Sequence, residues 1–359
     1  LSARTRAFRA RLGLRHPLLQ APMAGAATPA LAAAVTQAGA LGALGTATMA
    51  LPALAAEVSA LRALTLGGCN LNFFCHPDPQ PDPARSAAMR AGLAPFLGDR
   101  ALPSQDPPAP YPAFGPAHLD WLLAHPPRVA SFHFGLPPPD QVARLRAAGI
   151  VVIATATSVA EARAVQASGA DAVIAQGWEA GGHRGAFAVE PADAGVGLMA
   201  LLPQVADAVD IPVIAAGGIA DGRGIAAALV LGASAVQIGT AFLRCPEARL
   251  PEGHRRAVET ASDTDTHLTR AYSGRPARAR RTALGAALQD GPVTDYPLPR
   301  ALTSALAGSP GGAADFWLYG QAAALARALP AGNLVARLVA ETAAALRDLG
   351  QEAEAWTLD

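Results

Sequence analysis

Short apolar runs rich in Val, Ile, Leu and Ala alternate with longer Ala-rich stretches over most of the chain. This alternation is typical of βα units around a parallel sheet, because consecutive parallel strands need a crossover connection, usually a helix. The stretches between the runs have Pro, Ser or Gly at their ends, as helices often do. We predict eight strands, at 17–23, 40–46, 69–74, 129–135, 150–156, 171–177, 211–218 and 233–240, and six helices, at 29–39, 52–64, 139–148, 158–168, 197–209 and 222–231.

Eight such units are enough to close a TIM barrel, so we predict an α/β fold of this type over residues 1–75 and 117–243. The competing fold is an open, doubly wound parallel sheet. That fold has about five or six strands and often a GxGxxG turn after the first one. No such turn follows the run 17–23, which favours the closed barrel.

Two regions do not fit the repeat. Residues 76–116 contain 11 of the chain's 31 prolines, too many for a regular helix, and we predict an excursion or lid at the mouth of the barrel. Residues 244–359 are predicted to form a second, mainly helical domain on the substrate side. It ends in an amphipathic helix with Leu334, Leu338, Thr342 and Leu346 on one stripe.

The charges of the chain balance, because 28 basic and 28 acidic residues give a formal net charge of zero. No basic field is therefore present to bind nucleic acid or an anionic membrane surface. All the basic residues are arginines, and the lack of lysine excludes Schiff-base aldolases and pyridoxal-phosphate enzymes. Residues 275–281 contain four arginines, and a solvated or internally paired stretch explains them better than an anion site. The uncharged stretch 17–56 is interrupted by prolines and polar residues, so we predict no membrane span.

Cys69, Cys75 and Cys245 show no CxxC spacing and leave an odd count, which fits a reducing compartment better than a disulfide framework. No basic segment followed by an apolar one opens the chain, so we predict a cytoplasmic protein. There is no HExxH motif, and the pair Cys75-His76 has no obvious third ligand. We therefore predict no metal site.

Catalytic residues of a TIM barrel lie where the strands end on the carboxyl-terminal face. The seventh run ends in Gly217-Gly218, and the eighth ends in the sequence QIGT, from Gln237 to Thr240. These two loops form the standard phosphate site of the fold, and glycine lets phosphate oxygens approach the backbone amides. We predict a phosphate site here; the alternative is that the glycines only serve tight turns.

The sixth run leads into a glycine-rich loop, 176–185, that also contains a histidine and an arginine. A plain surface loop seldom has this composition after a buried strand, so we predict a ligand-binding loop. Asn70 and Asn72 end the third run on one face, and the first run ends in residues 20–23, which include a glutamine. Side-chain amides at such places bind the edge of a heterocycle or, alternatively, cap a neighbouring helix.

His133 closes the fourth run, which places its imidazole at the predicted mouth of the barrel. A lone histidine on an apolar strand is more often a satisfied core residue. A second histidine, His183, lies at the same end of the barrel, and the pair favours function over packing. We predict that His133 is a catalytic base, since an imidazole pKa near neutrality suits proton transfer.

Six motifs together resemble the nitronate monooxygenases, formerly called 2-nitropropane dioxygenases, and the match covers most of the barrel. The HFG and EAGGHRG motifs are similar to those of the bacterial class I enzymes. The resemblance implies bound FMN, no metal, and oxidation of anionic alkyl nitronates, such as propionate 3-nitronate, by O2 to a carbonyl compound and nitrite. The motifs are QAPMAG from Gln20, NLNFF from Asn70, HFG from His133, QGWEAGGHRG from Gln176, PVIAAGGI from Pro212 and QIGT from Gln237.

The resemblance also implies roles for individual residues. His133 corresponds to the family's catalytic histidine and His183 to a residue that lines the pocket, and we take both as catalytic candidates. Tyr319, in the segment FWLYGQ, and Arg184 are implied to contact the substrate. The family often has a lysine near this segment. Either Arg327 replaces it here as the cation, or this chain binds its substrate differently. The implied FMN contacts are Ala21, Pro22, Met23, Asn72, Gln176, Gly181, Gly182, Gly217, Gly218, Gln237, Ile238, Gly239 and Thr240.

Other functions are alternatives at this point. A flavin reductase on the same barrel would take hydride from NAD(P)H and reduce quinones or enoyl thioesters. A flavin-free phosphosugar isomerase or lyase would use the same phosphate loops for its substrate. A catalytically idle barrel would act as a binding module, and the sequence does not distinguish a monomer from a homodimer.

Overall fold

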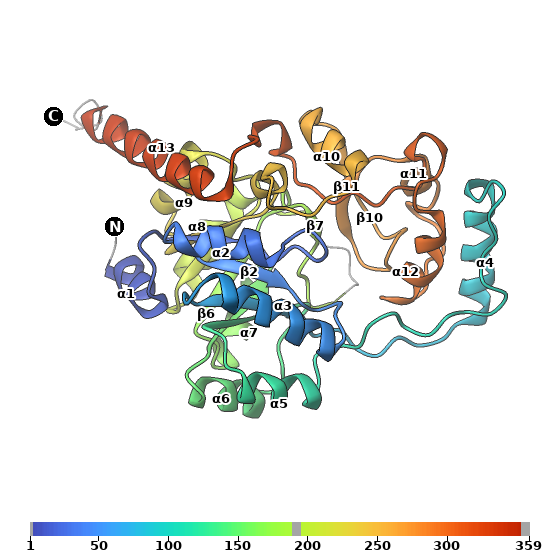
Figure 1. The fold of residues 1–359 in the computed structure, drawn as a ribbon, viewed down its shortest axis with the longest axis horizontal. Coiled ribbons are helices and arrows are strands. Elements are labelled where there is room, and N and C mark those ends of the chain that lie inside the picture. Colours follow the sequence, from blue (N-terminus) through green and yellow to red (C-terminus); the bar gives the residue numbers. More distant parts are fainter. Residues whose placement is uncertain (1–2, 189–194, 353–359) are drawn as a thin grey trace.

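The computed structural model describes residues 3–188 and 195–352. The predicted domains also include residues 1–2, 189–194 and 353–359, which lie outside the described residues. Eight parallel strands form the barrel, in the order β1-β9-β8-β6-β5-β4-β3-β2 (Figure 1). Its two edges meet where Leu19 pairs with Leu41, so backbone hydrogen bonds run round the whole barrel. This closure confirms the predicted TIM barrel and excludes the open sheet. The strands are β1 (Leu18–Gln20), β2 (Gly42–Gly45), β3 (Cys69–Phe74), β4 (Val129–His133), β5 (Val151–Ala156), β6 (Ala172–Gln176), β8 (Val213–Ala216) and β9 (Ala235–Ile238).

Helices surround the strands, and all six predicted helices are present. Thr28, Ser158 and Asp221 cap three of them, because their side-chain oxygens accept hydrogen bonds from backbone N–H groups of the first turn. Two further helices, α1 (Ala3–Leu12) and α5 (Pro116–Ala124), were not predicted. The six predicted ones are α2 (Pro29–Gln37), α3 (Leu51–Leu64), α6 (Pro139–Ala147), α7 (Val159–Ala167), α8 (Leu198–Ala208) and α9 (Gly222–Val230).

Alternating side chains along the strands build two cores. In β5, Val151 and Ile153 join the apolar cluster inside the barrel, whereas Val152 packs in the cluster between strands and outer helices. Phe8 and Leu12 of α1 join the interior cluster. They cover the amino-terminal end of the strands, so the carboxyl-terminal end is left to form a site.

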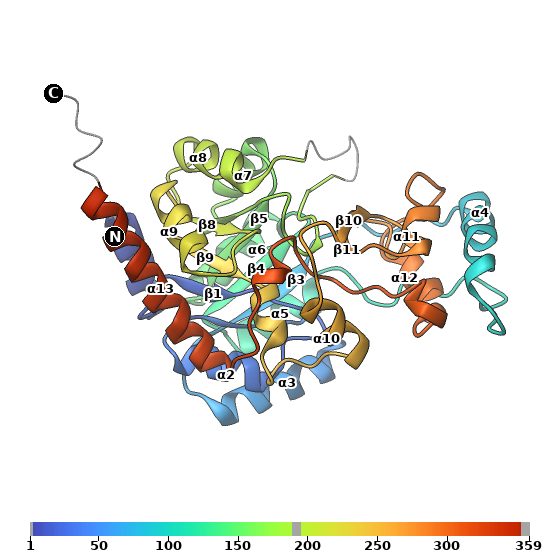
Figure 2. The same cartoon turned by 90° about the horizontal axis from the view of Figure 1, so that it is seen from above.

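A lobe lies over the carboxyl-terminal ends of the strands (Figures 1 and 2). It contains a three-stranded antiparallel sheet, β10-β11-β7, that was not predicted, because the alternating arginines and alanines of β11 look like a charge cluster. The strands are β7 (Gly182–His183), β10 (Thr266–Thr269) and β11 (Ala277–Arg280). The helices outside the barrel ring are α4 (Pro83–Leu93), α10 (Glu252–Glu259), α11 (Ala283–Ala287), α12 (Leu298–Thr303) and the short 3-10 turns Ala94–Phe96, Thr240–Arg244, Ser304–Leu306, Pro310–Gly312 and Ala323–Leu325.

The proline-rich excursion belongs to this lobe, at the right of Figure 1. Its helix α4 packs on α11 and α12, where Met89 and Leu93 share an apolar cluster with Leu288 and Leu302. The prolines had argued against a helix, but they bracket this one. Asp82 caps α4 and a proline occupies its first position, where no N–H is needed.

The last helix, α13 (Ala331–Glu352), lies along the barrel beside α9 and α2 (Figure 2). Leu334 and Leu338, on its predicted apolar stripe, are buried in the outer core of the barrel, whereas Leu346 at the far end of the stripe is exposed. The final part of the predicted C-terminal domain therefore packs as a helix of the barrel ring. Among the described residues, no helix combines the length and apolar character that a membrane span requires.

Candidate active site

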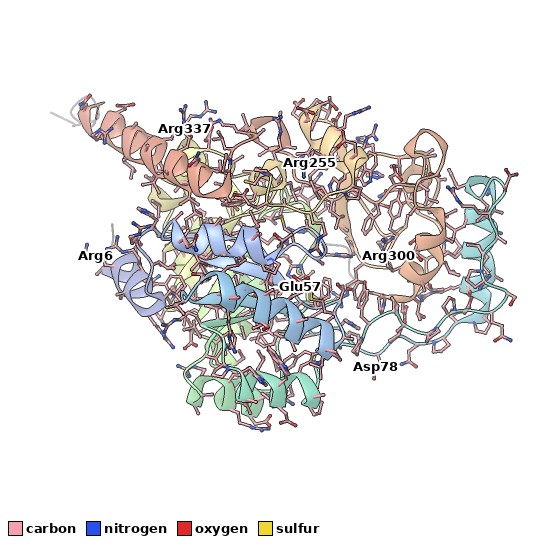
Figure 3. The ribbon with its side chains drawn as sticks, viewed as in Figure 1. Arg6, Glu57, Asp78, Arg255, Arg300 and Arg337 are labelled. Carbon is pink, nitrogen blue, oxygen red and sulfur yellow. The ribbon has the colours of Figure 1, made fainter. Side chains whose placement is uncertain are left out.

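A cavity of about 1290 Å³ lies between the strand ends and the lobe, larger than the roughly 300–1,000 Å³ of a typical ligand pocket. Arg300 of α12 projects into it from the lobe side (Figure 3). The structure brings together His133, His183, Tyr319 and every predicted cofactor residue except Ile238, whose side chain packs in the outer core. The predicted cofactor residues that line the cavity are Ala21, Pro22, Met23, Asn72, Gln176, Gly181, Gly182, Gly217, Gly218, Gln237, Gly239 and Thr240.

The predicted phosphate corner lies at the ends of β8 and β9, the seventh and eighth strands of the barrel. Gly217 and Gly218 have φ angles of 107° and 70°, which residues with a Cβ rarely adopt. A Cβ on Gly239 would lie 3.3 Å from that of Ala21, so the ends of β9 and β1 are close here. The Thr240 hydroxyl oxygen accepts a 2.9 Å hydrogen bond from the Gly320 N–H, which ties the lobe to this corner.

Three side-chain amides face the cavity. Asn72 donates from Nδ2 to the carbonyl oxygen of Ser131, 3.2 Å away, and this contact fixes which way the amide points. Gln176 donates from Nε2 to the His183 carbonyl oxygen at 3.0 Å, so its amide orients the glycine-rich loop. Gln237 Oε1 is buried and has no hydrogen-bond partner among the described residues. A buried acceptor of this kind costs stability unless a ligand donates to it.

His133 is held at both ring nitrogens. Its Nε2 lies 3.0 Å from the His183 carbonyl oxygen, which can only accept, so Nε2 carries the hydrogen. The neutral ring then leaves Nδ1 to accept from the Thr155 hydroxyl, 3.1 Å away. Burial lowers the pKa of His133 to about 4, helped by the charges of Arg275 and Arg184. The ring is therefore neutral at pH 7.

His183 points into the same cavity from β7, which pairs with β11 of the lobe. Its Nε2 donates to the Ser273 hydroxyl at 2.8 Å, because that hydroxyl itself donates to the Arg275 carbonyl oxygen. Its Nδ1 has no hydrogen-bond partner among the described residues. Burial lowers the pKa of His183 to about 3, and the neighbouring His133 and the charges of Arg275 and Arg300 lower it further.

Three buried arginines hold the loop that carries His183. Arg184, 1% exposed, donates to the carbonyl oxygens of Gln176 and Gly177 at 2.9 and 2.8 Å, and it does not line the cavity. The structure thus places this predicted substrate contact beneath the loop. Arg275 donates to the Ala186 carbonyl oxygen at 2.7 Å, and Arg278 to that of Trp178 at 2.8 Å. Arg275 and Arg278 are therefore bonded within the protein, as the interpretation of residues 275–281 as an internally paired stretch predicts.

Several cavity residues escaped prediction. Thr155 lies near the end of β5, so the same search of strand ends that found His133 could have found it. Ser273 and Arg300 come from the lobe, where no rule of strand ends tells which side chains face the cavity. Among the described residues, no cluster of three or more His, Cys, Asp or Glu has the arrangement of a metal site.

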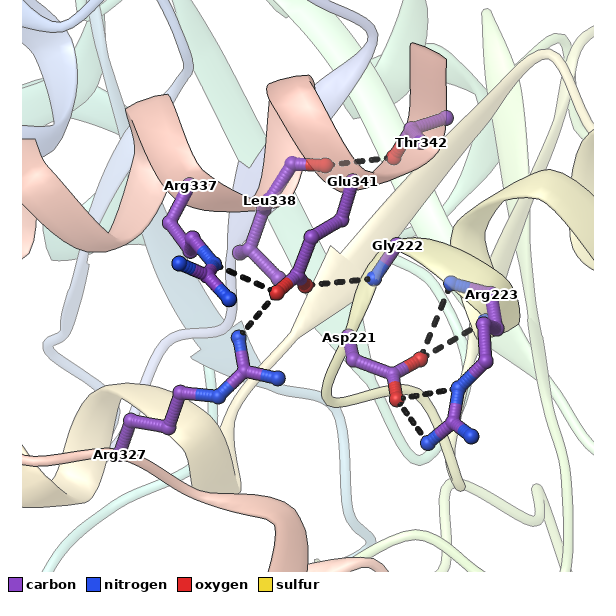
Figure 4. Close-up of polar contacts among 9 residues, drawn as sticks. Asp221, Gly222, Arg223, Arg327, Arg337, Leu338, Glu341 and Thr342 are labelled. Atoms are coloured by element: carbon purple, nitrogen blue, oxygen red, sulfur yellow. Dashed lines mark hydrogen bonds and ion pairs between the residues drawn. The ribbon is translucent and has the colours of Figure 1, made fainter. Parts of the chain in front are cut away.

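Arg327 is not a cavity residue. Its Nη1 lies 2.7 Å from Glu341 Oε1, which also accepts from Arg337 Nε at 2.7 Å (Figure 4). The other oxygen of Glu341 accepts from the Gly222 N–H at 3.2 Å, so the network fastens α13 to the start of α9. Arg327 therefore does not supply the cation that the lysine-free site was expected to need.

A closed βα barrel with a predicted phosphate corner and two half-buried histidines above its strand ends is the architecture of a TIM-barrel enzyme. The chain belongs to the nitronate monooxygenase family, whose family model matches residues 6–341. This is a family of flavin-dependent oxidoreductases, so the chain is an enzyme of that class.

Relatives match the chain over nearly its whole length. A nitronate monooxygenase of Paraburkholderia phytofirmans is 45% identical over 351 residues, which are 95% of this chain and 96% of the relative. The structure of nitroalkane oxidase from Streptomyces ansochromogenes has a TM-score of 0.85 and 42% identity and covers 94% of this chain and 98% of that one. The structure of FabK from Thermotoga maritima has a TM-score of 0.73 and 30% identity, and the match covers 98% of this chain and 99% of that one.

Proposed function

We propose that the chain is an FMN-dependent nitronate monooxygenase that oxidises alkyl nitronates, such as propionate 3-nitronate, with O2 to a carbonyl compound and nitrite. The observation that carries this proposal is the meeting of the phosphate corner and the pair His133 and His183 in one cavity of a chain from this family. FMN, when bound, supplies the redox chemistry; the chain supplies binding, orientation and electrostatics.

The cavity residues fit a flavin mononucleotide. Gly217, Gly218 and the turn at Gly239 leave backbone uncovered where a phosphate would be held. The partnerless Oε1 of Gln237 is an acceptor for an N–H on the cofactor ring. Only one phosphate corner is present in the predicted loops and no ADP-binding fingerprint occurs in the sequence, which favours FMN over FAD.

His133 is a weak base in this state, so the site favours a substrate that is already an anion over one that must first be deprotonated. Its pKa of about 4 leaves it neutral at pH 7 but makes it a weak base. Any proton that it accepts must go to Nδ1, since Nε2 is committed to the His183 carbonyl. Preformed nitronate therefore needs less from this residue than a neutral nitroalkane does.

The positive potential around the histidines supports an anionic substrate. The buried guanidinium of Arg275 lowers the pKa of both His133 and His183, and the same field stabilises a negative charge placed between them. Its Cζ lies 4.3 Å from the ring centroid of Phe134, so the charge is held in place.

An aerobic assay with propionate 3-nitronate tests the function. We expect a yellow protein that consumes O2 and releases nitrite only when both O2 and nitronate are present. A yellow protein that is inert to nitronates but is bleached by NADH without oxygen would make it a reductase. A colourless protein that FMN does not activate would overturn the cofactor assignment.

The cellular setting belongs to the same proposal. Cys69, Cys75 and Cys245 are free thiols in the structure, which suits a reducing compartment, and we place the enzyme in the cytoplasm. Its partners are then the nitronate and O2.

A further inference from the structure

Arg300 is a half-buried cation of the cavity wall that has no carboxylate partner in the part of the chain that the structure describes. It lines the cavity from α12, and its guanidinium carbon lies 5.5 Å from the ring centroid of Phe316. It makes no side-chain hydrogen bond or ion pair with any residue of the described ranges. Burial lowers its pKa, which shows that the charge is held there at a cost.

The other arginines near the site differ from Arg300 in this respect. Arg275 and Arg278 donate to backbone carbonyls, and these bonds satisfy them. Arg249 also lines the cavity, but its side chain is exposed and lies 3.9 Å from the carboxylate of Glu57.

Two carboxylates line the same cavity, and neither pairs with Arg300. Glu179 accepts a 2.9 Å hydrogen bond from the Leu198 N–H, and Asp315 accepts a 3.3 Å bond from the Gly308 N–H. The guanidinium of Arg300 is therefore left for an anion that enters the cavity.

Arg300 lies on the lobe side of the site. Its charge lowers the pKa of His183, whereas the cations that lower the pKa of His133 are Arg275 and Arg184. Apart from Gly181 and Gly182 of the glycine-rich loop, the predicted cofactor residues that line the cavity lie at the ends of the barrel strands and not in the lobe. An anionic group on Arg300 is therefore one at the end of the substrate remote from the cofactor.

We propose that Arg300 is a specificity-determining residue that binds a carboxylate at the far end of the substrate. The guanidinium fork matches a carboxylate, and its stacking on Phe316 holds the fork in place. The identity of the reacting end rests on the proposed function, while the carboxylate site rests on Arg300 alone. In this reading the enzyme selects nitronates that carry a second negative charge.

The test compares two substrates of nearly the same shape. Propionate 3-nitronate carries the carboxylate, and 3-methylbutyl nitronate has two methyl groups in place of the two carboxylate oxygens. We expect Arg300→Gln to lower kcat/KM about 10- to 100-fold for the carboxylate substrate and less than about threefold for its isostere, as loss of a charged hydrogen bond requires. Arg300→Lys keeps the positive charge but not the forked guanidinium, so its kcat/KM for the carboxylate substrate should lie between those of the wild type and of Arg300→Gln.

Two measurements separate a binding role from a structural one. The surface variant Arg256→Gln removes one positive charge from an exposed pair with Glu252. It should leave kcat/KM unchanged for both nitronates. Calorimetric titration with 3-nitropropionate should show binding that Arg300→Gln weakens at least tenfold, at unchanged melting temperature and flavin content.

The outcomes distinguish the two proposals. Equal losses with both substrates, or no loss with either, would overturn the carboxylate site and leave the proposed function intact. Binding of 3-nitropropionate that depends on Arg300, without nitrite release from either nitronate, would overturn the proposed function and leave the carboxylate site.

Discussion

His133 donates a hydrogen bond from Nε2 to the backbone carbonyl oxygen of His183, 3.0 Å away. The same oxygen accepts from Gln176 Nε2, also at 3.0 Å, so two donors occupy its two lone pairs. One carbonyl thus fixes an imidazole from β4 and an amide from β6. His133 is left with one nitrogen for chemistry, Nδ1, and the Thr155 hydroxyl occupies that one.

This relationship predicts that His133→Asn affects two substrates unequally. Turnover of neutral nitroethane needs a proton to be removed, so its kcat/KM should fall by about 10²–10⁴, the range for loss of a general base. Preformed ethyl nitronate needs no such step and should lose about tenfold or less. Steady-state nitrite release with both substrates measures the ratio, and flavin content should be unchanged. An equal fall with both would show that His133 is not a base.

Thr155→Val tests the other contact of the His133 ring, the hydrogen bond between Nδ1 and the Thr155 hydroxyl. The Thr155 hydroxyl stabilises the neutral ring, so its removal should raise the pKa of His133 from about 4 toward the ordinary value. The acid limb of kcat/KM with nitroethane should then move up by roughly 0.5–1 pH unit, the worth of one hydrogen bond. An unmoved limb would assign that limb to another group.

Much of the barrel side of this site could be predicted, because a TIM barrel places the residues that end its strands at one face. That rule brings Asn72, His133 and Gln176 together from three separate strands. It says nothing of the lobe, whose elements reach the cavity from irregular sequence. Arg300 stands on a six-residue helix, and no periodic pattern marks its exposed face.

Arg184 shows a different limit. The family resemblance implied a substrate contact for Arg184, which follows His183 in the glycine-rich loop. The guanidinium turns inward instead, because the carbonyl oxygens of Gln176 and Gly177 at the end of β6 need donors. Where a long side chain goes depends on which backbone groups lack partners, and a single sequence does not show that.

The backbone at Gly217 provides a test of the phosphate corner. Gly217→Ala would force a Cβ at φ 107° and place it 3.1 Å from the Ala180 nitrogen, so the turn must shift. We expect FMN affinity to fall at least about tenfold, because the backbone strain at residue 217 costs roughly 1–3 kcal/mol. Absorbance at flavin wavelengths per protein after gel filtration measures the loss.

Gly149→Ala is the matched control for this strain. Gly149 has φ 80°, and a Cβ there meets nothing within 4 Å. It does not line the cavity, so the variant should lose about 1 kcal/mol of stability and keep its flavin. Equal flavin retention by the two variants would place the phosphate elsewhere.

The unfolding free energy should depend on pH through three histidines whose pKa values are lowered in the folded chain. His133, His183 and His254 have pKa values lowered, mainly by burial, to about 4, 3 and 4. Below the unfolded value near 6.5 the unfolded chain binds protons that the folded chain does not, so the unfolding free energy falls as pH drops toward 4. Between pH 7 and 5 the loss should be about 2 kcal/mol per histidine. Urea titrations across this range measure the slope, which His133→Asn should reduce; a flat profile would contradict the burial of neutral rings.

Tyr319 combines a site in the cavity wall with a hydroxyl that has no partner among the described residues. Its pKa is raised to about 12, chiefly by burial, so the phenol is protonated at neutral pH and stands as a donor. Tyr319→Phe removes an unsatisfied buried group and should raise the unfolding free energy of the flavin-loaded, substrate-free enzyme by about 1 kcal/mol. Tyr272→Phe is the control, because the Tyr272 hydroxyl bonds to that of Thr282, and this variant should lower the unfolding free energy by about 1 kcal/mol.

If the Tyr319 hydroxyl is kept at this cost for the substrate, as its predicted role requires, Tyr319→Phe should also raise KM for nitronates several-fold. A stabilised variant with unchanged KM would remove Tyr319 from the substrate contacts and leave its ring as a packing element against Leu243 and Val258.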